Sequence, residues 1–268
     1  MPLEFPIEEG AVSNDALLGI LEAPGGFRMF VQPIVEITTA KHRVVGYECL
    51  ARGPAGSELD SSEELFEYVR LCQATTRIDL LCLQLALQTA QKLPWSAQIV
   101  VKQHMITLED EPRFPQLCEG VARSAGIDPS RLTIAISEHS QRVPSLGFER
   151  TLGALRDRKI AIALDGVGTG YANYQLMIGC QPNYYRLDRW FVAGIATDAA
   201  RQAVVMSLLL LASRIGACVM VEGVQDLGDL SALRRLGVEL FQGDLFGRAI
   251  SPEEASDRED VGIARARE

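Results

Sequence analysis

The stretch that decides the fold reads Ala163-Leu164-Asp165-Gly166-Val167-Gly168-Thr169-Gly170-Tyr171. The apolar run from Ile160 to Leu164 is typical of a buried β-strand, and it ends at the carboxylate of Asp165. Three glycines follow within five residues, so the backbone there can turn tightly and approach a ligand closely. A carboxylate at the end of a buried strand, with a glycine loop beyond it, indicates a site in an α/β barrel. The alternative is an ordinary strand-to-helix turn.

Strand-like and helix-like runs alternate on both sides of this stretch. Two β-like runs, Phe27 to Ile37 and Val44 to Leu50, come first, with a hairpin turn expected at residues 38–42. The order β then α predicts a parallel sheet, and 268 residues suit one modified (β/α)8 TIM-like barrel of the α/β class. An open doubly wound sheet is the alternative, but no G-x-G-x-x-G follows a first strand. The later strands are expected at 98–102, 132–137, 160–164, 184–187, 218–221 and 240–243, and the longer helices at 76–92, 113–125, 148–157, 200–215 and 226–236.

Composition and charge limit the possible functions. The net charge of −9 disfavours a general nucleic-acid surface, so no direct nucleic-acid partner is expected. The longest apolar run, residues 203–212, is half of the ~20 residues that a membrane span needs, and no signal peptide is visible. The six cysteines form no C-x-x-C pair, which indicates reduced thiols in a cytoplasmic protein. We expect an N-terminal extension at 1–26, a barrel at 27–252 and a charged tail at 253–268.

Polar residues occur where the apolar strands stop. In a parallel barrel the carboxyl ends of the strands meet at one face, so these side chains are expected to converge there. The residues at the strand ends are Glu48, Lys102, Glu138, Asp165, Glu222 and Gln242.

Together these residues resemble the EAL domain family, bacterial phosphodiesterases that hydrolyse the second messenger cyclic di-GMP. The resemblance covers about Phe27 to Pro252, and it implies a barrel whose first strand runs antiparallel to its neighbours. The matching segments are Gln32-Pro33-Ile34-Val35, Glu48-Cys49-Leu50-Ala51-Arg52 at E-A-L-x-R, Asp165 to Tyr171 at D-D-F-G-T-G-Y, Arg186 to Phe191 at K-I-D-x-x-F, Val221 to Val224 at A-E-G-V, and Gln242-Gly243 at Q-G.

The chain departs from the family at the positions that the resemblance assigns to metal and catalysis. Family members hold Mg²⁺ or Mn²⁺ with Glu, Asn, Glu and two Asp, and a Lys assists the attacking water. Glu48 and Asp165 are retained here as remnants of the metal ligands, and Glu222 is retained beside them. The replacements are Lys102 for the Asn, Ala135 for a Glu, Gly166 for the second Asp, Arg186 for the catalytic Lys, and Gln225 for the last Glu of A-E-G-V-E.

These replacements predict the loss of metal-dependent hydrolysis. Two carboxylates and the ammonium of Lys102 leave a net charge of about −1, whereas Mg²⁺ needs several oxygen ligands. Arg186 keeps a positive charge but cannot deprotonate, and its guanidinium is wider than an ammonium. We therefore expect no intact catalytic set and no bound cofactor, with Mg²⁺ or Mn²⁺ relevant only if residual hydrolysis exists.

Three functions remain open. The favoured one is regulation by contact with a protein partner, within cyclic di-GMP-related signalling. The second is a metal-independent cyclic di-GMP receptor, in which Glu138 anchors the loop after Asp165 and Lys102 either lies between Glu48 and Asp165 or forms only an ion pair. The third is a weak phosphodiesterase. The ligand-binding candidates are Gln32, Arg52, Lys102 and Gln242.

Two expectations concern the surface. The helix Ala203 to Ile215 is expected to be core rather than interface. Tyr184, Tyr185 and Trp190 flank the region through which EAL domains commonly dimerise, so a homodimer is possible, with packing at strand ends as the alternative.

Overall fold

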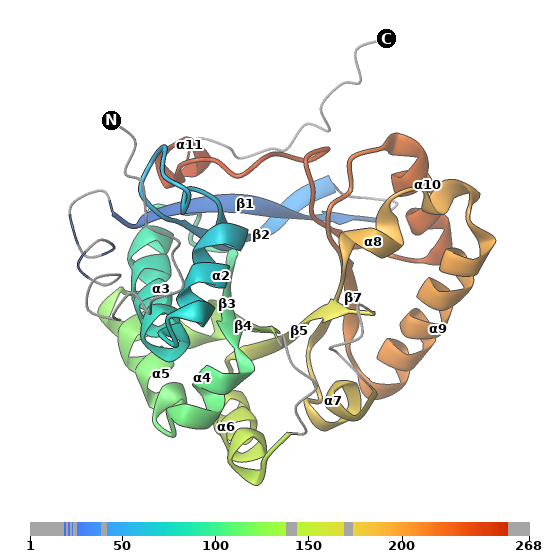
Figure 1. Ribbon diagram of the computed structural model, residues 1–268. Helices are drawn as coiled ribbons and strands as arrows, with labels where there is room; N and C mark the ends of the chain where they lie inside the picture. Colours follow the sequence, from blue (N-terminus) through green and yellow to red (C-terminus); the bar gives the residue numbers. More distant parts are fainter. Residues whose placement is uncertain are drawn as a thin grey trace.

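A computed structural model describes residues 19, 21, 23, 26–38, 42–137, 144–168 and 174–256. In this part of the chain the strands β1 to β8 close a barrel in sequence order (Figure 1). β1 pairs antiparallel with both β2 and β8, and the other neighbours pair in parallel. The predicted barrel with one antiparallel strand is therefore confirmed. The strands are β1 Arg28–Ile37, β2 His42–Arg52, β3 Gln98–His104, β4 Leu132–Ser137, β5 Ala161–Val167, β6 Tyr184–Leu187, β7 Cys218–Val221 and β8 Leu240–Phe241.

The helices lie around the outside of the barrel (Figure 1). Side chains of Ser61, Ser145 and Asp226 accept hydrogen bonds from the first-turn amides of α2, α6 and α10, which fixes where these helices begin. The short helices α4, α7 and α8 were not predicted, because six residues or fewer show no clear helical period. The helices are α2 Ser62–Leu71, α3 Thr75–Ala90, α4 Met105–Asp110, α5 Phe114–Ser124, α6 Leu146–Asp157, α7 Tyr174–Gly179, α8 Arg189–Val192, α9 Ala199–Ile215, α10 Leu227–Leu236 and α11 Pro252–Ser256, with 3-10 turns η1 Pro129–Arg131 and η2 Ile195–Thr197.

The main apolar core lies between the strands and the helices that surround them. Outward-facing strand residues such as Ile134, Ile162 and Leu164 are completely buried there. A second, smaller cluster joins five buried residues from β1, β3, β4, β5 and β7. Its members include Ala135 and Ala163, so small side chains occupy part of the barrel interior. Burial of apolar surface in these clusters is the main stabilising contribution to the fold.

β5 is longer than predicted. It continues past Asp165 to Val167, and its pairing with β6 shifts register between Leu164 and Val167. Gly166 occupies the left-handed region at φ 62°, which glycine adopts without strain. Gly168 also has a positive φ, 98°, and a Cβ atom built there would lie 2.1 Å from the Phe191 ring. Gly166 therefore serves backbone geometry, and Gly168 serves both backbone geometry and close packing. Thr169, Gly170 and Tyr171 lie outside the described residues.

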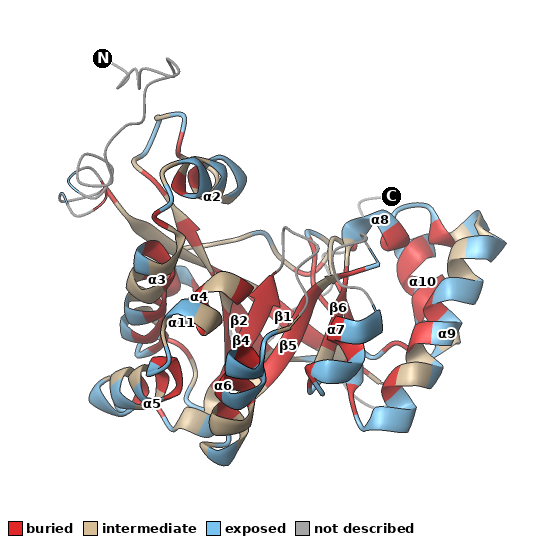
Figure 2. Ribbon diagram, turned by 60° about the horizontal axis from the view of Figure 1, so that its bottom comes forward, coloured by how far each residue is buried: buried red, intermediate tan, exposed pale blue. Residues whose placement is uncertain are grey.

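The expectation that α9 is a core helix was wrong. Only Val205, Leu208 and Ala212 of its seventeen residues are buried. Figure 2 shows the outer turns of α9 in the colour of exposed residues. The exposed apolar side chains include Met206, 50% exposed, and Leu210, 60% exposed. α9 carries apolar residues on all sides, so the pattern could not show which side packs on the barrel.

Two further sequence expectations are resolved by burial. All six cysteines are free; Cys49, Cys82, Cys118 and Cys180 are buried, Cys72 is half-buried and Cys218 is exposed. Burial raises the pKa of the Cys49 thiol, with a smaller contribution from Glu48, to about 12. Among the described residues, no helix combines the length and the hydropathy that crossing a bilayer requires.

Candidate functional site

One end of the barrel collects the polar side chains that the sequence placed at strand ends. In parallel strands, residues at the carboxyl ends face the same side, and alternate residues point into the barrel. Arg186, two residues after Tyr184 on β6, points inward in the same way. The structure brings together seven predicted residues, which we call the polar cluster: Gln32, Glu48, Lys102, Asp165, Arg186, Glu222 and Gln242.

Arg186 lies at the centre of the polar cluster. Its Nη2 atom lies 2.8 Å from Oε2 of Glu48, and its Nη1 atom lies 3.5 Å from Oδ1 of Asp165. Its Nε atom forms an ion pair of 2.5 Å with Oε1 of Glu222. The side chain is 1% exposed and is the largest of the fully buried side chains. One guanidinium therefore contacts all three carboxylates, and each of its nitrogens contacts a different one.

Of the two placements considered for Lys102, the structure has the ion pair, and it is formed with Asp165. Its Nζ atom lies 2.6 Å from Oδ2 of Asp165, and its side chain is 40% exposed. Arg186, rather than Lys102, is the cation that contacts both Glu48 and Asp165. Lys102 therefore forms an ion pair with Asp165 at the open side of the cluster, and part of its side chain remains accessible.

The two glutamines connect the cluster to β1. The Nε2 atom of Gln242 donates to Oε1 of Gln32 at 3.0 Å and to Oε2 of Glu48 at 2.7 Å. The Oε1 atom of Gln242 accepts from Nη2 of Arg186 at 3.3 Å. Gln32 in turn donates to the backbone oxygen of Gly247 at 3.1 Å. The Gln242 amide thus uses both its donor and its acceptor side within the protein.

Burial and the ion pairs within the cluster shift the pKa values of its charged residues. Burial alone would raise the pKa of Asp165, but attraction to Lys102 and Arg186 outweighs it and holds that pKa well below its usual range. Attraction to Asp165 raises the pKa of Lys102. Burial lowers the pKa of Arg186, but attraction to Glu222, Glu48 and Asp165 exceeds that effect and raises it. Burial raises the pKa of Glu222 well above its usual range. Three carboxylates therefore share two cations, Arg186 and Lys102.

This arrangement does not fit a two-metal site. Arg186 and Lys102 contact the oxygens of Glu48 and Asp165 that a metal ion would need. Lys102, Ala135 and Gly166 offer no side-chain oxygen at the positions that the resemblance assigns to metal ligands. At about 4 Å and a surface-like dielectric, each pair of unit like charges repels by about 4 kcal/mol. Within the described residues, no group of three or more His, Cys, Asp or Glu side chains is arranged to hold a metal ion.

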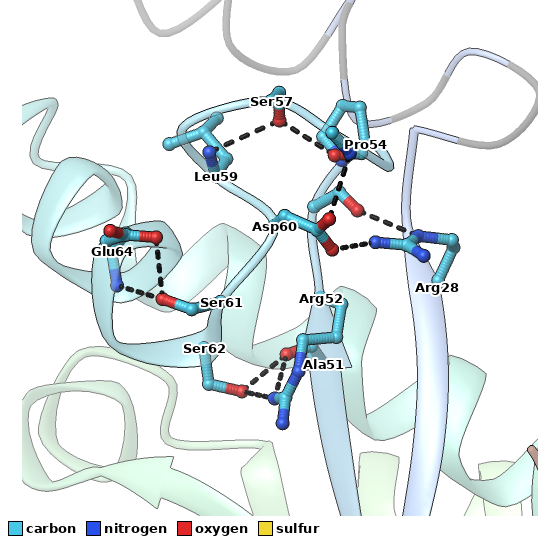
Figure 3. Close-up of polar contacts among 12 residues, drawn as sticks. Arg28, Ala51, Arg52, Pro54, Ser57, Leu59, Asp60, Ser61, Ser62 and Glu64 are labelled. Atoms are coloured by element: carbon cyan, nitrogen blue, oxygen red, sulfur yellow. Dashed lines mark hydrogen bonds and ion pairs between the residues drawn. The ribbon is translucent and has the colours of Figure 1, made fainter. Parts of the chain in front are cut away.

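Arg52 lies apart from the polar cluster. Its Nη1 atom donates to the backbone oxygen of Ala51 at 3.0 Å and to the hydroxyl of Ser62, the first residue of α2 (Figure 3). The neighbouring loop is held by an ion pair between Arg28 and Asp60 (Figure 3). No sequence pattern indicates the contact with Ser62, because a serine at a helix start usually predicts only a cap. Glu138, the expected loop anchor, lies outside the described residues.

The aromatic residues considered for dimerisation differ in their surroundings. Tyr185 is completely buried, and its hydroxyl donates to the backbone oxygen of Met177 at 2.9 Å. Trp190 is 59% exposed; its ring packs edge-on against Phe191 and under the guanidinium of Arg201. Packing at strand ends therefore accounts for Tyr185, while Trp190 remains on the surface.

Curated relatives resemble this chain over parts of their length. The cyclic di-GMP phosphodiesterase PA2567 of Pseudomonas aeruginosa is 25% identical over 239 residues, which cover 87% of this chain and 40% of the relative. The blue light- and temperature-regulated antirepressor BluF of Escherichia coli is 23% identical over 144 residues, covering 54% of this chain and 36% of the relative. The chain spans between 19% and 40% of the length of the first curated relatives that it matches.

Solved structures share the barrel. Klebsiella pneumoniae BlrP1 in a manganese and cyclic di-GMP complex has a TM-score of 0.74 and 29% identity, covering 85% of this chain and 56% of that chain. BlrP1 with FMN and cyclic di-GMP but no metal ions has a TM-score of 0.70 and 26% identity, covering 85% and 54%. Residues 15–249 match the family described as the EAL domain. By its sequence, its barrel and its structural neighbours, the chain belongs to the EAL domain family.

Proposed function

We propose that this protein is a non-hydrolytic EAL domain that acts in cyclic di-GMP-related signalling through contact with a regulatory protein partner. The observation that carries the proposal is the pairing of Glu48, Asp165 and Glu222 with the guanidinium of Arg186. Lys102 also pairs with Asp165. The two cations, Arg186 and Lys102, thus contact the carboxylates that would otherwise bind metal. Without a metal-activated water, the family's reaction lacks its nucleophile.

Two observations favour protein contact over small-molecule binding. The amide of Gln242 is used within the polar cluster, and Arg52 is held against Ser62, so two candidate ligand contacts are already engaged. α9 exposes Met206 and Leu210, and exposed apolar patches commonly mark protein–protein contact sites. The similarity to BluF, an antirepressor by name, is in keeping with a regulatory role.

The second candidate is a metal-independent receptor for cyclic di-GMP. BlrP1 holds this nucleotide in a structure without metal ions. In this chain the 40% exposed side chain of Lys102 offers a positive charge at the open side of the cluster, where a phosphate would have to bind. In this hypothesis, Arg52 or Gln242 must release an internal hydrogen bond in order to bind the nucleotide.

Calorimetry and turnover assays on the full chain separate these functions. Cyclic di-GMP is titrated in Mg²⁺, in Mn²⁺ and in EDTA, and hydrolysis is followed with labelled nucleotide. Neither heat nor turnover is expected for a protein-contact domain. Binding in EDTA that Arg52→Ala abolishes would support the receptor instead. Turnover that Glu48→Gln abolishes would contradict both non-hydrolytic readings.

The partner itself is sought by photo-cross-linking on α9. A photoreactive amino acid at Met206 is compared in the host cell with the same residue at exposed Glu149 on α6. A protein cross-linked only from position 206 is then purified and titrated with the full chain. Met206→Lys combined with Leu210→Lys should weaken its binding at least tenfold, while Glu149→Lys should not. Equal binding by both variants would remove α9 from the proposed contact.

A further inference from the structure

A cavity of about 460 Å³ lies at the opposite end of the barrel from the carboxylates of the polar cluster, Glu48, Asp165 and Glu222. It is lined at the amino ends of the strands by residues such as Gly46, Thr133 and Tyr184, and from outside by Leu209 and Ala212 of α9. Arg186 is the one member of the polar cluster that also lines it. The volume is within the range of small-molecule sites, and it corresponds to about fifteen waters at about 30 Å³ each.

Small residues at two inner positions, Gly46 and Ala163, leave part of the barrel interior unfilled at this level. Gly46 cannot be replaced by a residue with a side chain without a clash, since a Cβ atom there would lie 2.7 Å from the backbone oxygen of Gln98. Ala163 contributes only a methyl group to the inner wall. Barrels of this class usually fill their interior with layers of large branched side chains. The unfilled space here is mostly apolar, with Ile34, Met220 and Leu240 also lining it.

A second hollow of about 370 Å³ adjoins the cavity. Gly237 and Glu239 line both spaces, so the two lie side by side at that edge, which we call the shared mouth. The second hollow presents Arg234 and Arg235, both exposed at the end of α10. Within the described part of the chain, no ion pair joins either guanidinium to a carboxylate.

The charges around the shared mouth favour an anion. Arg43 and Glu36 neutralise each other, with Nε of the arginine 2.7 Å from Oε2 of the glutamate. Glu239 then faces two arginines, which leaves a net charge of about +1. Arg234 and Arg235 also complement the dipole at the helix end, but that role needs no adjoining apolar cavity.

We propose that this end of the barrel binds a small organic acid with an apolar body, of the size of a medium-chain fatty carboxylate. The hydrocarbon enters the cavity toward Arg186, and the carboxylate pairs with Arg234 and Arg235 at the mouth. Arginine presents two parallel N–H groups that match a carboxylate. The proposed acid site does not depend on the function of the polar cluster. It is expected whether the cluster hydrolyses cyclic di-GMP, binds it or does not bind it.

The apolar part of the proposal is tested by chain length. The full chain is titrated calorimetrically with acetate, hexanoate, octanoate and decanoate, each below its micelle concentration. Burial of one methylene is expected to tighten binding about fourfold, until the chain outgrows the cavity. Acetate is expected not to bind measurably. Equal affinities from acetate to decanoate, or no binding of any of them at millimolar concentration, would overturn the proposal.

The location is tested with Cys218, the exposed cysteine, which lines the cavity. Its reaction with a thiol reagent is followed with and without octanoate, in a Cys72→Ser background that removes the other cysteine that is not buried. Octanoate is expected to slow labelling of Cys218 in proportion to the calorimetric occupancy. Labelling that octanoate at saturation leaves unchanged would place the bound acid elsewhere and overturn the assignment.

The charged part is tested with Arg234→Gln combined with Arg235→Gln. This variant should bind octanoate at least tenfold more weakly, while binding of 1-octanol, which has the body without the charge, should change less than twofold. The matched control is Arg150→Gln combined with Arg214→Gln, which removes two other exposed arginines. Equal octanoate binding by both double variants would overturn the role of the arginine pair.

Discussion

The Nη2 atom of Arg186 lies 2.8 Å from Oε2 of Glu48, deep within the barrel. The arginine is on β6 and the glutamate on β2, so the contact spans the barrel interior rather than joining neighbouring strands. Both residues are almost completely buried, at 1% and 4% exposure. A buried charge is tolerated when it is paired, and this pair places a fixed cation beside a carboxylate that the resemblance to the family assigns to metal binding. The first predictions follow from that exchange.

Arg186→Met should destabilise the protein by about 3–5 kcal/mol, because it leaves the carboxylates of Glu48 and Asp165 buried without their central cation. Arg186→Lys, which keeps one positive charge, should cost less. The free energy of unfolding is measured in urea at pH 7 for both variants. A Met variant as stable as the parent protein would mean that the carboxylates do not need this partner.

Restoring the family pattern should create a metal site. The variant combines Lys102→Asn, Ala135→Glu, Gly166→Asp and Arg186→Lys, which removes one net positive charge and adds two carboxylates. Asp is among the residues that tolerate the positive φ found at position 166. Mn²⁺ binding by calorimetry and turnover of cyclic di-GMP are expected in this variant.

Two controls accompany the restored variant. Lys102→Asn alone should bind Mn²⁺ far more weakly, because Arg186 still contacts Glu48 and Asp165. Glu48→Gln in the restored background should abolish turnover. A folded quadruple variant that binds no Mn²⁺ would show that charge at the cluster is not what prevents metal binding.

The stability of the Glu222→Gln variant relative to the parent protein should increase as the pH rises. The pKa of Glu222 is raised in the folded protein, so the folded state keeps a proton that the unfolded state releases above about pH 4.3. The parent therefore loses stability from about pH 4 upward, toward the raised pKa, while Gln has no such loss. Urea unfolding of both proteins from pH 4 to 8 tests this. Parallel stability profiles would contradict the raised pKa.

Asp165→Asn should show the opposite dependence. Its pKa is held low in the folded protein, so Asp165 contributes stability above about pH 3.9 and loses it as the pH falls through the folded value. The stability difference between parent and variant should be largest near pH 7 and shrink below pH 4. A difference that stays constant down to pH 2 would exclude ionisation of Asp165 as its cause.

Two leucines of α9 should differ sharply in their effect on stability. Leu208 is 7% exposed, so Leu208→Ala should cost about 2–5 kcal/mol. Leu210 is 60% exposed, so Leu210→Lys should change the free energy of unfolding by less than about 0.5 kcal/mol. A large loss with Leu210→Lys would mean that this face of α9 is covered in the folded protein.

The sequence by itself determined the barrel and most of its elements. Strands such as β4 and β7 begin and end at the predicted residues, because their apolar runs are short and sharply bounded. It also determined which polar residues meet, because inward-pointing residues at the carboxyl ends of parallel strands share one face. The absence of side-chain oxygens at positions 102, 135 and 166 was visible in the sequence, since ligand chemistry depends on residue type.

The tertiary structure alone decided how those residues pair, which side of α9 is exposed and where a cavity remains. The reach of a side chain across a barrel depends on strand register and barrel radius, which no local pattern contains; hence Arg186, rather than Lys102, contacts both Glu48 and Asp165. Arg52 turns to Ser62 because the loop at 53–61 returns the start of α2 beside β2. Which side of α9 packs, and the cavity at the amino ends of the strands, likewise depend on how distant segments fill space together.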